Sequence, residues 1–197
     1  RIFKKLLISF TFFFLILKPC YSIDELDAIK YIENVGQKAI DILKTPIENL
    51  EKREYLFEQM LNNNFDKKLI HRAVLGKASR GASKEQLLRF GEAFDKHIVK
   101  VYASQLGVYS NQLFIIDKAY KKGKKDTIVS SHIEHETAPP LRIDWRLRDR
   151  GEGTKIIDIA IEGVSLLATK RADFGASIKK GGLHALIIDL ETKNAQN

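Results

Sequence analysis

Cysteine is almost absent from this chain. The only one among 197 residues is Cys20, at the end of an N-terminal segment that we expect to be removed. The remaining chain would then hold no disulfide, no thiol nucleophile and no thiolate metal ligand. Its stability must come from an ordinary hydrophobic core, and the chain is long enough to build a domain around one.

Recognisable catalytic motifs are also missing. The sequence contains no G-x-S-x-G stretch, and none of its five histidines belongs to a nucleophile–base motif. We therefore expect no catalytic residues and no enzymatic activity. A hydrolase whose triad is assembled only by the fold is an open alternative.

Two stretches resemble a phosphate-binding loop and a metal site, but neither lies in the secondary structure that such a site needs. The stretch RGEGTK at 150–155 resembles a phosphate-binding loop, but it joins two expected strands and no helix follows it. His132 and His135 lie three apart in an expected strand, so their side chains point to opposite faces and cannot share an ion. We expect no metal and no cofactor.

The N-terminal segment 1–22 has the composition of a secretory signal peptide. A basic start, RIFKK, is followed by an apolar stretch at 6–17 and then by KPCYS, which is the order of regions in signal peptides. Cys20 and Ser22 occupy the small positions that a signal peptidase prefers, so we expect cleavage after Ser22. Lipid modification of Cys20 and an uncleaved anchor are the alternatives.

The positive charge of the chain gives little support to nucleic-acid binding. Half of the formal net charge of +8 comes from Arg1, Lys4, Lys5 and Lys18, in the segment expected to be removed. The remaining basic residues are dispersed among acids, as in EKRE at 51–54. We expect no nucleic-acid partner.

Residues from about 23 to 110 are expected to be helical, because apolar residues recur three or four apart. Two capping boxes, Thr45 with Glu48 and Ser83 with Gln86, mark helix starts. The second box opens the longest helix, which is expected to run to about Tyr109. The apolar stripe of this helix consists of Leu87, Phe90, Phe94, Ile98, Tyr102, Leu106 and Tyr109.

From about 111 to 162 the apolar pattern changes to a period of two, which predicts strands. A hairpin turning at 122–124 comes first, and two more strands follow. Their core-facing residues are Leu141, Ile143, Trp145 and Leu147 in one strand and Ile157, Ile159 and Ile161 in the next. Two helices are expected over about 165–194, with a break at Gly181-Gly182.

This order of elements predicts an α+β fold. Helices should pack on one face of a curved antiparallel β-sheet of about four strands. Residues 23–197 are expected to form a single domain. The aromatic helix and the two apolar strands supply one interior, and their periodicity alone does not distinguish a packed core from a binding cavity.

Several stretches in order resemble the MlaC family. They are FDKKLIHRAVLG at 65–76, RFGEAFDKHIVKVYASQLGVYSNQ at 89–112, LRIDWRLRDRGEGTKIIDIAIEGVSL at 141–166 and KRADFGASIKKGGLHALIIDL at 170–190. The likeness covers about 65–197, whereas residues 23–64 agree only in helical character. One departure is Thr169-Lys170-Arg171, where many members have Asn-Tyr-Arg, so a role of the missing tyrosine does not carry over.

The resemblance implies a periplasmic phospholipid carrier, the soluble component of an ABC transport system that maintains outer-membrane lipid asymmetry. Its implied partners are phospholipid, the MCE-domain subunit of an inner-membrane ABC transporter and an outer-membrane lipoprotein–porin complex, with no stable membrane insertion after signal removal. The family's lipid tails lie in an apolar cavity between sheet and helices. Such a carrier needs no catalytic group, because burial of two acyl chains is worth on the order of 20 kcal/mol at ~0.8 kcal/mol per methylene.

We therefore expect an apolar lipid cavity whose walls come from the long helix, the sheet and the following helix. The predicted lipid-binding residues are Phe90, Phe94, Ile98, Tyr102, Leu106, Ile143, Trp145, Leu147, Ile159, Ile161 and Leu167. Each of them is equally well explained as a core residue, since cavity walls and cores share a composition. The alternative function is a periplasmic adaptor with a filled core that acts only through protein contacts.

The sequence Glu162-Gly163-Val164-Ser165 lies where the last expected strand becomes a helix. By the two-residue period Glu162 faces outward, Gly163 frees the backbone to turn, and Ser165 is a suitable N-cap. We interpret this stretch as a joint between sheet and helix, not as a catalytic site.

Replacement of Gly163 by Val is expected to impair folding or lipid retention more than Glu162→Gln, because the joint depends on backbone freedom and not on the carboxylate. Thermal unfolding and lipid extraction of the two variants would check this order. The reverse order would support a functional carboxylate at position 162.

Overall fold

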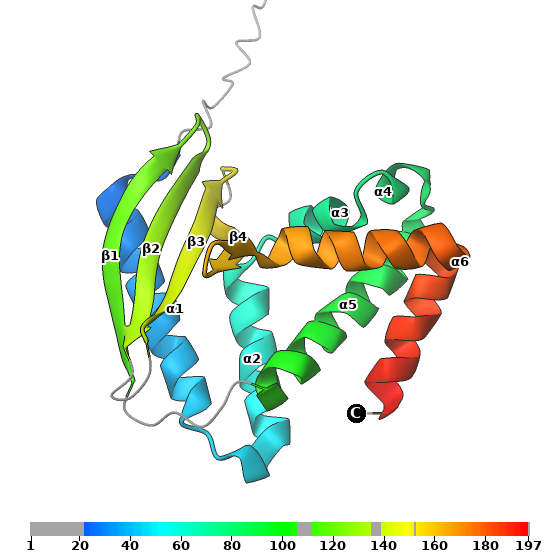
Figure 1. The fold of residues 1–197 in the computed structure, drawn as a ribbon, viewed down its shortest axis with the longest axis horizontal. Helices are drawn as coiled ribbons and strands as arrows, with labels where there is room; N and C mark the ends of the chain where they lie inside the picture. Colours follow the sequence, from blue (N-terminus) through cyan, green and yellow to red (C-terminus); the bar gives the residue numbers. More distant parts are fainter. Residues whose placement is uncertain (1–21, 106–111, 135–138, 152, 197) are drawn as a thin grey trace, which may run out of the picture.

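The computed structural model of the protein describes residues 22–105, 112–134, 139–151 and 153–196. The expected signal peptide, apart from Ser22, lies outside these residues, as do Leu106, Tyr109 and His135. Within them, helices come first, consecutive strands follow and a long helical segment ends the chain, as Figure 1 shows. The predicted α+β class is confirmed.

The described strands form an antiparallel meander in the order β1-β2-β3-β4-β5. Their bounds are β1 Leu113–Lys122, β2 Asp126–Glu134, β3 Leu141–Asp149, β4 Thr154–Ile161 and β5 Val164–Ser165. The sheet has five strands where about four were expected, because the two residues of β5 turn back and pair with the end of β4. The alternation predicted for 141–147 is confirmed, since the three residues Ile143, Trp145 and Leu147 are buried.

The helices before the sheet are α1 Glu25–Leu43, the short 3-10 helix η1 Ile47–Asn49, α2 Leu50–Asn64, α3 Lys67–Leu75, α4 Ala78–Gly81 and α5 Lys84–Gln105. The Ser83–Gln86 capping box is confirmed, because each side chain accepts a hydrogen bond from the other residue's backbone N–H, at 3.0 and 3.1 Å. The prediction of a capping box at Thr45 and Glu48 is wrong. Pro46 precedes η1 there, and no side chain caps it.

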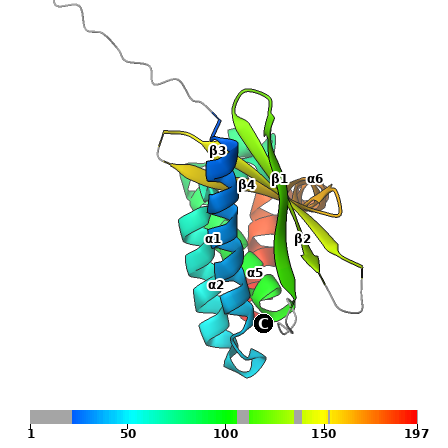
Figure 2. The ribbon, with the colours of Figure 1, turned by 90° about the vertical axis from the view of Figure 1, so that its left-hand side faces the viewer.

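Helix α6, Leu166–Gln196, contains the break expected near Gly181-Gly182, because Gly182 has φ 78° and ψ 172°. Figure 1 shows its first half running away from β4 and its second half turning down beside α5. In Figure 2, α1 and α2 run lengthwise beside the strands. The helices and the sheet therefore surround a common interior.

Strand β4 departs from the alternation expected for 157–161. Arg146 of β3 pairs with Asp158 and the next residue, Leu147, pairs with Ile156, so Ile157 is an extra residue in a β-bulge. Directly paired residues lie on the same face of a sheet, so Ile156 shares the inner face with Leu147. A bulge leaves its extra residue without a partner in the ladder, and Ile157 is nevertheless buried.

Among the described residues, buried apolar side chains gather in three clusters instead of one. The helical cluster joins α3, α5 and α6 through Val74, Leu75, Phe90, Ala93, Phe94, Phe174, Leu186, Ile187 and Leu190. The sheet cluster joins α1 to the strands through Ala28, Ile32, Val35, Val129, Ile143, Trp145, Leu147 and Ile156. The hairpin cluster joins α1, α2 and α5 through Ile42, Phe57, Met60 and Val99.

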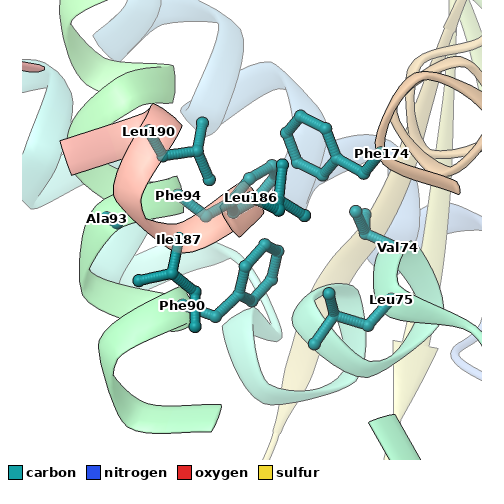
Figure 3. Packing of buried hydrophobic residues seen from close by; sticks show 9 residues of the cluster. All are labelled: Val74, Leu75, Phe90, Ala93, Phe94, Phe174, Leu186, Ile187 and Leu190. Carbon is teal, nitrogen blue, oxygen red and sulfur yellow. The ribbon is translucent and has the colours of Figure 1, made fainter. Parts of the chain in front are cut away.

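Aromatic rings fix the geometry of the helical cluster, which Figure 3 shows from close by. The rings of Phe90 and Phe94 stack at 5.6 Å between centroids, and Phe174 meets them edge-on at 6.0 and 5.9 Å. Stacked and edge-to-face pairs are the favoured aromatic arrangements. They hold the first half of α6 against α5.

Two arginines enclose one carboxylate at the start of β2. Asp126 is 2% exposed, and it accepts hydrogen bonds from Arg146 Nε at 2.7 Å and Arg148 Nε at 2.6 Å. Burial alone would raise the pKa of Asp126, but the hydrogen bonds and charges of Arg148 and Arg146 outweigh it, so this pKa lies below its ordinary value. The ionised carboxylate therefore stabilises the pairing of β2 with β3.

Replacement of Asp126 by Asn is expected to lower the free energy of unfolding by about 1–3 kcal/mol at pH 7. Because the folded pKa is depressed, this stabilisation is present above the unfolded pKa of about 4 and is lost as pH falls through the lower folded value. Urea unfolding at pH 7, 5 and 3 should show the difference from wild type shrinking at pH 3. A difference independent of pH, or an equal loss in the exposed control Asp173→Asn, would contradict it.

Candidate functional site: an apolar cavity between sheet and helices

A cavity of about 490 Å³ lies between the three clusters. It equals the liquid volume of roughly 16 water molecules at ~30 Å³ each, far above the voids of a close-packed core. It falls in the range of small-molecule binding sites, ~300–1,000 Å³. Helices α1, α2, α3, α5 and α6 and strands β1 to β4 all contribute to its walls.

Most of the predicted wall residues border this cavity. Those that do are Phe94, Ile98, Tyr102, Ile143, Trp145, Ile159, Ile161 and Leu167. Phe90 and Leu147 do not: both are fully buried, Phe90 in the helical cluster and Leu147 in the sheet cluster. Leu106 lies outside the described residues.

A second group of wall residues was not predicted. It consists of Gly36, Ala39, Ile40 and Leu43 of α1, Phe57, Met60 and Leu61 of α2, and Phe114, Ile133, Leu141 and Ile157 of the sheet, with Phe65, Ile70 and Leu166. The apolar stripe of α1 was visible in the sequence. Nothing in that stripe indicated which part of it faces a cavity, because this depends on how α1 packs against the sheet.

Trp145 presents an apolar surface to the cavity because its polar atom is satisfied elsewhere. The indole N–H donates to Ser131 Oγ at 2.9 Å, and the Ser131 hydroxyl donates to the carbonyl of Ile143 at 3.1 Å. The ring of Phe114 meets the indole edge-on at 6.3 Å. A buried indole N–H normally needs such a partner, so this arrangement leaves the ring free to contact an apolar ligand.

Gly36 lets α1 approach the sheet at this wall. A Cβ at this position would lie 2.3 Å from Phe114 Cε1, far inside van der Waals contact. The absent side chain therefore makes room for the Phe114 ring, which borders the cavity. Tyr102 borders it from α5, and burial raises the pKa of its phenol, so the hydroxyl stays neutral at physiological pH.

Acidic residues at the cavity are engaged in structural contacts. Asp158 accepts hydrogen bonds from Ser165 Oγ at 2.7 Å and from the backbone N–H of Leu167 at 3.1 Å. Ser165 Oγ in turn accepts from Ala168 N at 3.0 Å, so the N-cap predicted at Ser165 is confirmed. These contacts fasten the first turn of α6 to β4.

The turn before that helix has the backbone that the joint requires. Glu162 has φ 49° and Gly163 has φ 77°, and a two-residue hairpin turn with both φ values positive favours glycine. The Glu162 carboxylate accepts the backbone N–H of Arg142 at 2.6 Å, which ties the turn to β3. The interpretation of Glu162 as part of a joint fits this geometry.

Asp95 is held by two basic groups at the end of the cavity bordered by α3 and α5. Its carboxylate contacts Lys67 Nζ at 2.8 Å and His71 Nε2 at 2.6 Å. His71 also packs edge-on against Phe90 and Phe94. In the part of the chain that the structure describes, no group of three or more His, Cys, Asp or Glu side chains converges as metal ligands do.

The family assignment follows from the sequence as a whole. The sequence model described as MlaC protein matches residues 33–192. The chain belongs to the MlaC family. The α+β fold is the one that the resemblance led us to expect of a MlaC protein.

Two characterised relatives are similar over part of their length. Toluene tolerance protein ttg2D of Pseudomonas putida is 24% identical over 106 residues, which are 54% of this chain and 49% of that protein. The intermembrane phospholipid transport system binding protein MlaC of Haemophilus influenzae is 27% identical over 127 residues, 62% of this chain and 59% of that protein. The matches thus span about half to three fifths of these relatives.

A solved structure shares the MlaC fold over most of the chain. The phospholipid-binding protein of Ralstonia solanacearum, solved in complex with a phospholipid, superposes with a TM-score of 0.76 at 24% identity. The superposition covers 85% of this chain and 96% of that one. At this identity the likeness establishes the fold. Separately, no helix among the described residues is both long and apolar enough to cross a bilayer.

Truncation of a packed residue of α5, Phe90, should cost more stability than truncation of a cavity-wall residue of the same helix, Ile98. Phe90→Ala should lower the free energy of unfolding of the delipidated protein by about 3–5 kcal/mol, because Phe90 is fully packed. Ile98→Ala should cost less, about 1–2 kcal/mol, since its side chain already borders the cavity and loses fewer contacts. Urea unfolding of both variants measures this, and equal losses would contradict the placement of Ile98 at the cavity.

Proposed function

We propose that this protein is a periplasmic phospholipid carrier that holds the acyl chains of its cargo in the apolar cavity. The observation that carries the proposal is the cavity itself, whose walls are apolar side chains from both the sheet and the helices. The proposed tail contacts are the wall residues predicted from sequence, now without Phe90 and Leu147, together with the unpredicted residues of α1, α2 and the sheet. Leu106 stays a predicted contact.

The size of the cavity and its lining favour an apolar ligand. A volume of about 490 Å³ is far larger than the voids of a close-packed core, and its walls are mainly apolar side chains. Acyl chains that cover these walls would gain ~0.8 kcal/mol per buried methylene. The same argument disfavours the alternative of an adaptor with a filled core.

Membership of the MlaC family supports the rest of the proposal. The protein would shuttle phospholipid between the inner and outer membranes as the soluble component of an ABC transport system. It would dock on the MCE-domain subunit of the inner-membrane transporter and on an outer-membrane lipoprotein–porin complex. The named functions of the two relatives, phospholipid transport and toluene tolerance, are consistent with this role.

Lipid extraction tests the proposal directly. The full chain, expressed in a Gram-negative bacterium, should be recovered from the periplasmic fraction, and mass spectrometry of a solvent extract should find phospholipid near stoichiometric amount. Ala39→Trp places an indole in the cavity and should reduce the recovered lipid several-fold. Ala176→Trp, on an exposed part of α6, is the matched control and should retain it. Absence of phospholipid from the natively purified wild type would overturn the carrier function.

A further inference from the structure

Three charged residues that border the apolar cavity are Lys67 of α3, Asp95 of α5 and Lys170 of α6. Each of them lies three residues from a side chain packed against the helical cluster. The three neighbours are Ile70, Ile98 and Leu167. Three residues is about one helical turn, which places both side chains on the same helix face.

These residues differ in their direct polar contacts. Asp95 contacts Lys67 and His71, and Lys67 also donates to Asn62 Oδ1 at 2.6 Å. Lys170, by contrast, makes no hydrogen bond or ion pair with any residue that the structure describes. The other carboxylate at the cavity, Asp158, is occupied by Ser165 and Leu167 at the start of α6. Among the described residues, no carboxylate therefore contacts the Lys170 ammonium directly.

The surroundings of Lys170 make that charge effective. Its side chain is half-buried at an apolar cavity, where an ammonium gains more from a partner than it does in bulk water. The charge of Lys170 also acts on the neighbouring side chain of His97. Burial lowers the pKa of His97 first of all, and the charges of Lys170 and Lys193 lower it further, against an opposing effect of Asp189.

We propose that Lys170 binds the phosphate group of a diacyl phospholipid whose tails fill the cavity. The inference rests on the proposed carrier function and adds the orientation of the cargo. A phosphodiester carries a single negative charge and would supply the direct ionic contact that Lys170 does not make among the described residues. Charge-assisted hydrogen bonds of this kind are about twice as strong as neutral ones.

Titration calorimetry of the delipidated full-length protein tests this with two short-chain probes, dihexanoyl phosphatidylglycerol and dihexanoylglycerol. They carry the same tails and differ in the phosphate headgroup. Wild type should bind the phospholipid more tightly than the diacylglycerol. Lys170→Gln should weaken phospholipid binding by about three- to tenfold, as expected for a half-exposed ionic contact, and should leave diacylglycerol binding unchanged.

Two control variants separate a phosphate contact of Lys170 from a general effect of the protein's net charge. Lys170→Arg keeps the charge and should keep the preference for the phospholipid. Lys179→Gln removes an exposed lysine from the same helix and should bind both probes as wild type does. Equal melting temperatures of Lys170→Gln and wild type would show that the loss does not come from misfolding.

The other possible results would overturn either the phosphate contact or the carrier function. Unchanged phospholipid affinity in Lys170→Gln, or an equal loss for both probes, would overturn the phosphate contact while leaving the carrier function intact. Failure of wild type to bind either probe would instead overturn the carrier function. Inorganic phosphate should give no saturable heat up to millimolar concentration. Saturation as tight as that of the phospholipid would make free phosphate the ligand and would overturn the headgroup assignment.

Discussion

The whole arrangement depends on keeping an apolar volume open inside a molecule whose side chains would gain by closing it. A single central core would collapse into that volume, because every contact made there is favourable. This fold instead distributes its packing over three clusters around the cavity. Each cluster joins different elements, so moving one wall inward would break contacts in the cluster behind it.

The joint between β4 and α6 connects the sheet to a helical wall of the cavity. The hydroxyl of Ser165 links the Asp158 carboxylate to the first turn of α6, and the Glu162-Gly163 turn sets the direction in which the helix leaves. Since the first half of α6 then meets α3 and α5 in the helical cluster (Figure 3), the direction fixed at this joint determines where the far side of the cavity lies.

The sequence was sufficient for those parts of the structure that follow from periodicity. Alternation over 141–147 identified the buried face of β3, and helical spacing identified the stripe of α5. It was insufficient where tertiary packing decides. Phe90 and Phe94 are one turn apart on the same stripe, yet only Phe94 borders the cavity, whereas Phe90 is fully buried in the helical cluster.

Other features that the sequence did not predict also depend on tertiary packing. The bulge at Ile157 shifts the inner face of β4 by one residue. An inserted residue within a run of isoleucines leaves no local sequence pattern that would predict it. The contribution of α1 and α2 to the walls depends on long-range contacts, such as that of Gly36 with the Phe114 ring. Lys67, Asp95 and Lys170 come from three helices far apart in sequence, so only the fold reveals that Lys170 borders the cavity without a direct polar partner among the described residues.

The apolar character of the walls has a consequence for how a cargo would move. Dispersion and hydrophobic contacts have no preferred direction, so a tail lying on Ile98, Trp145 and Ile159 can slide along its own axis without breaking any discrete bond. Resistance to motion arises only at the opening, where each methylene that enters water costs ~0.8 kcal/mol. An acceptor protein whose apolar surface continues from the opening would remove this barrier. If the cargo is a lipid, its transfer would then be fast in a docked complex and very slow from the free protein.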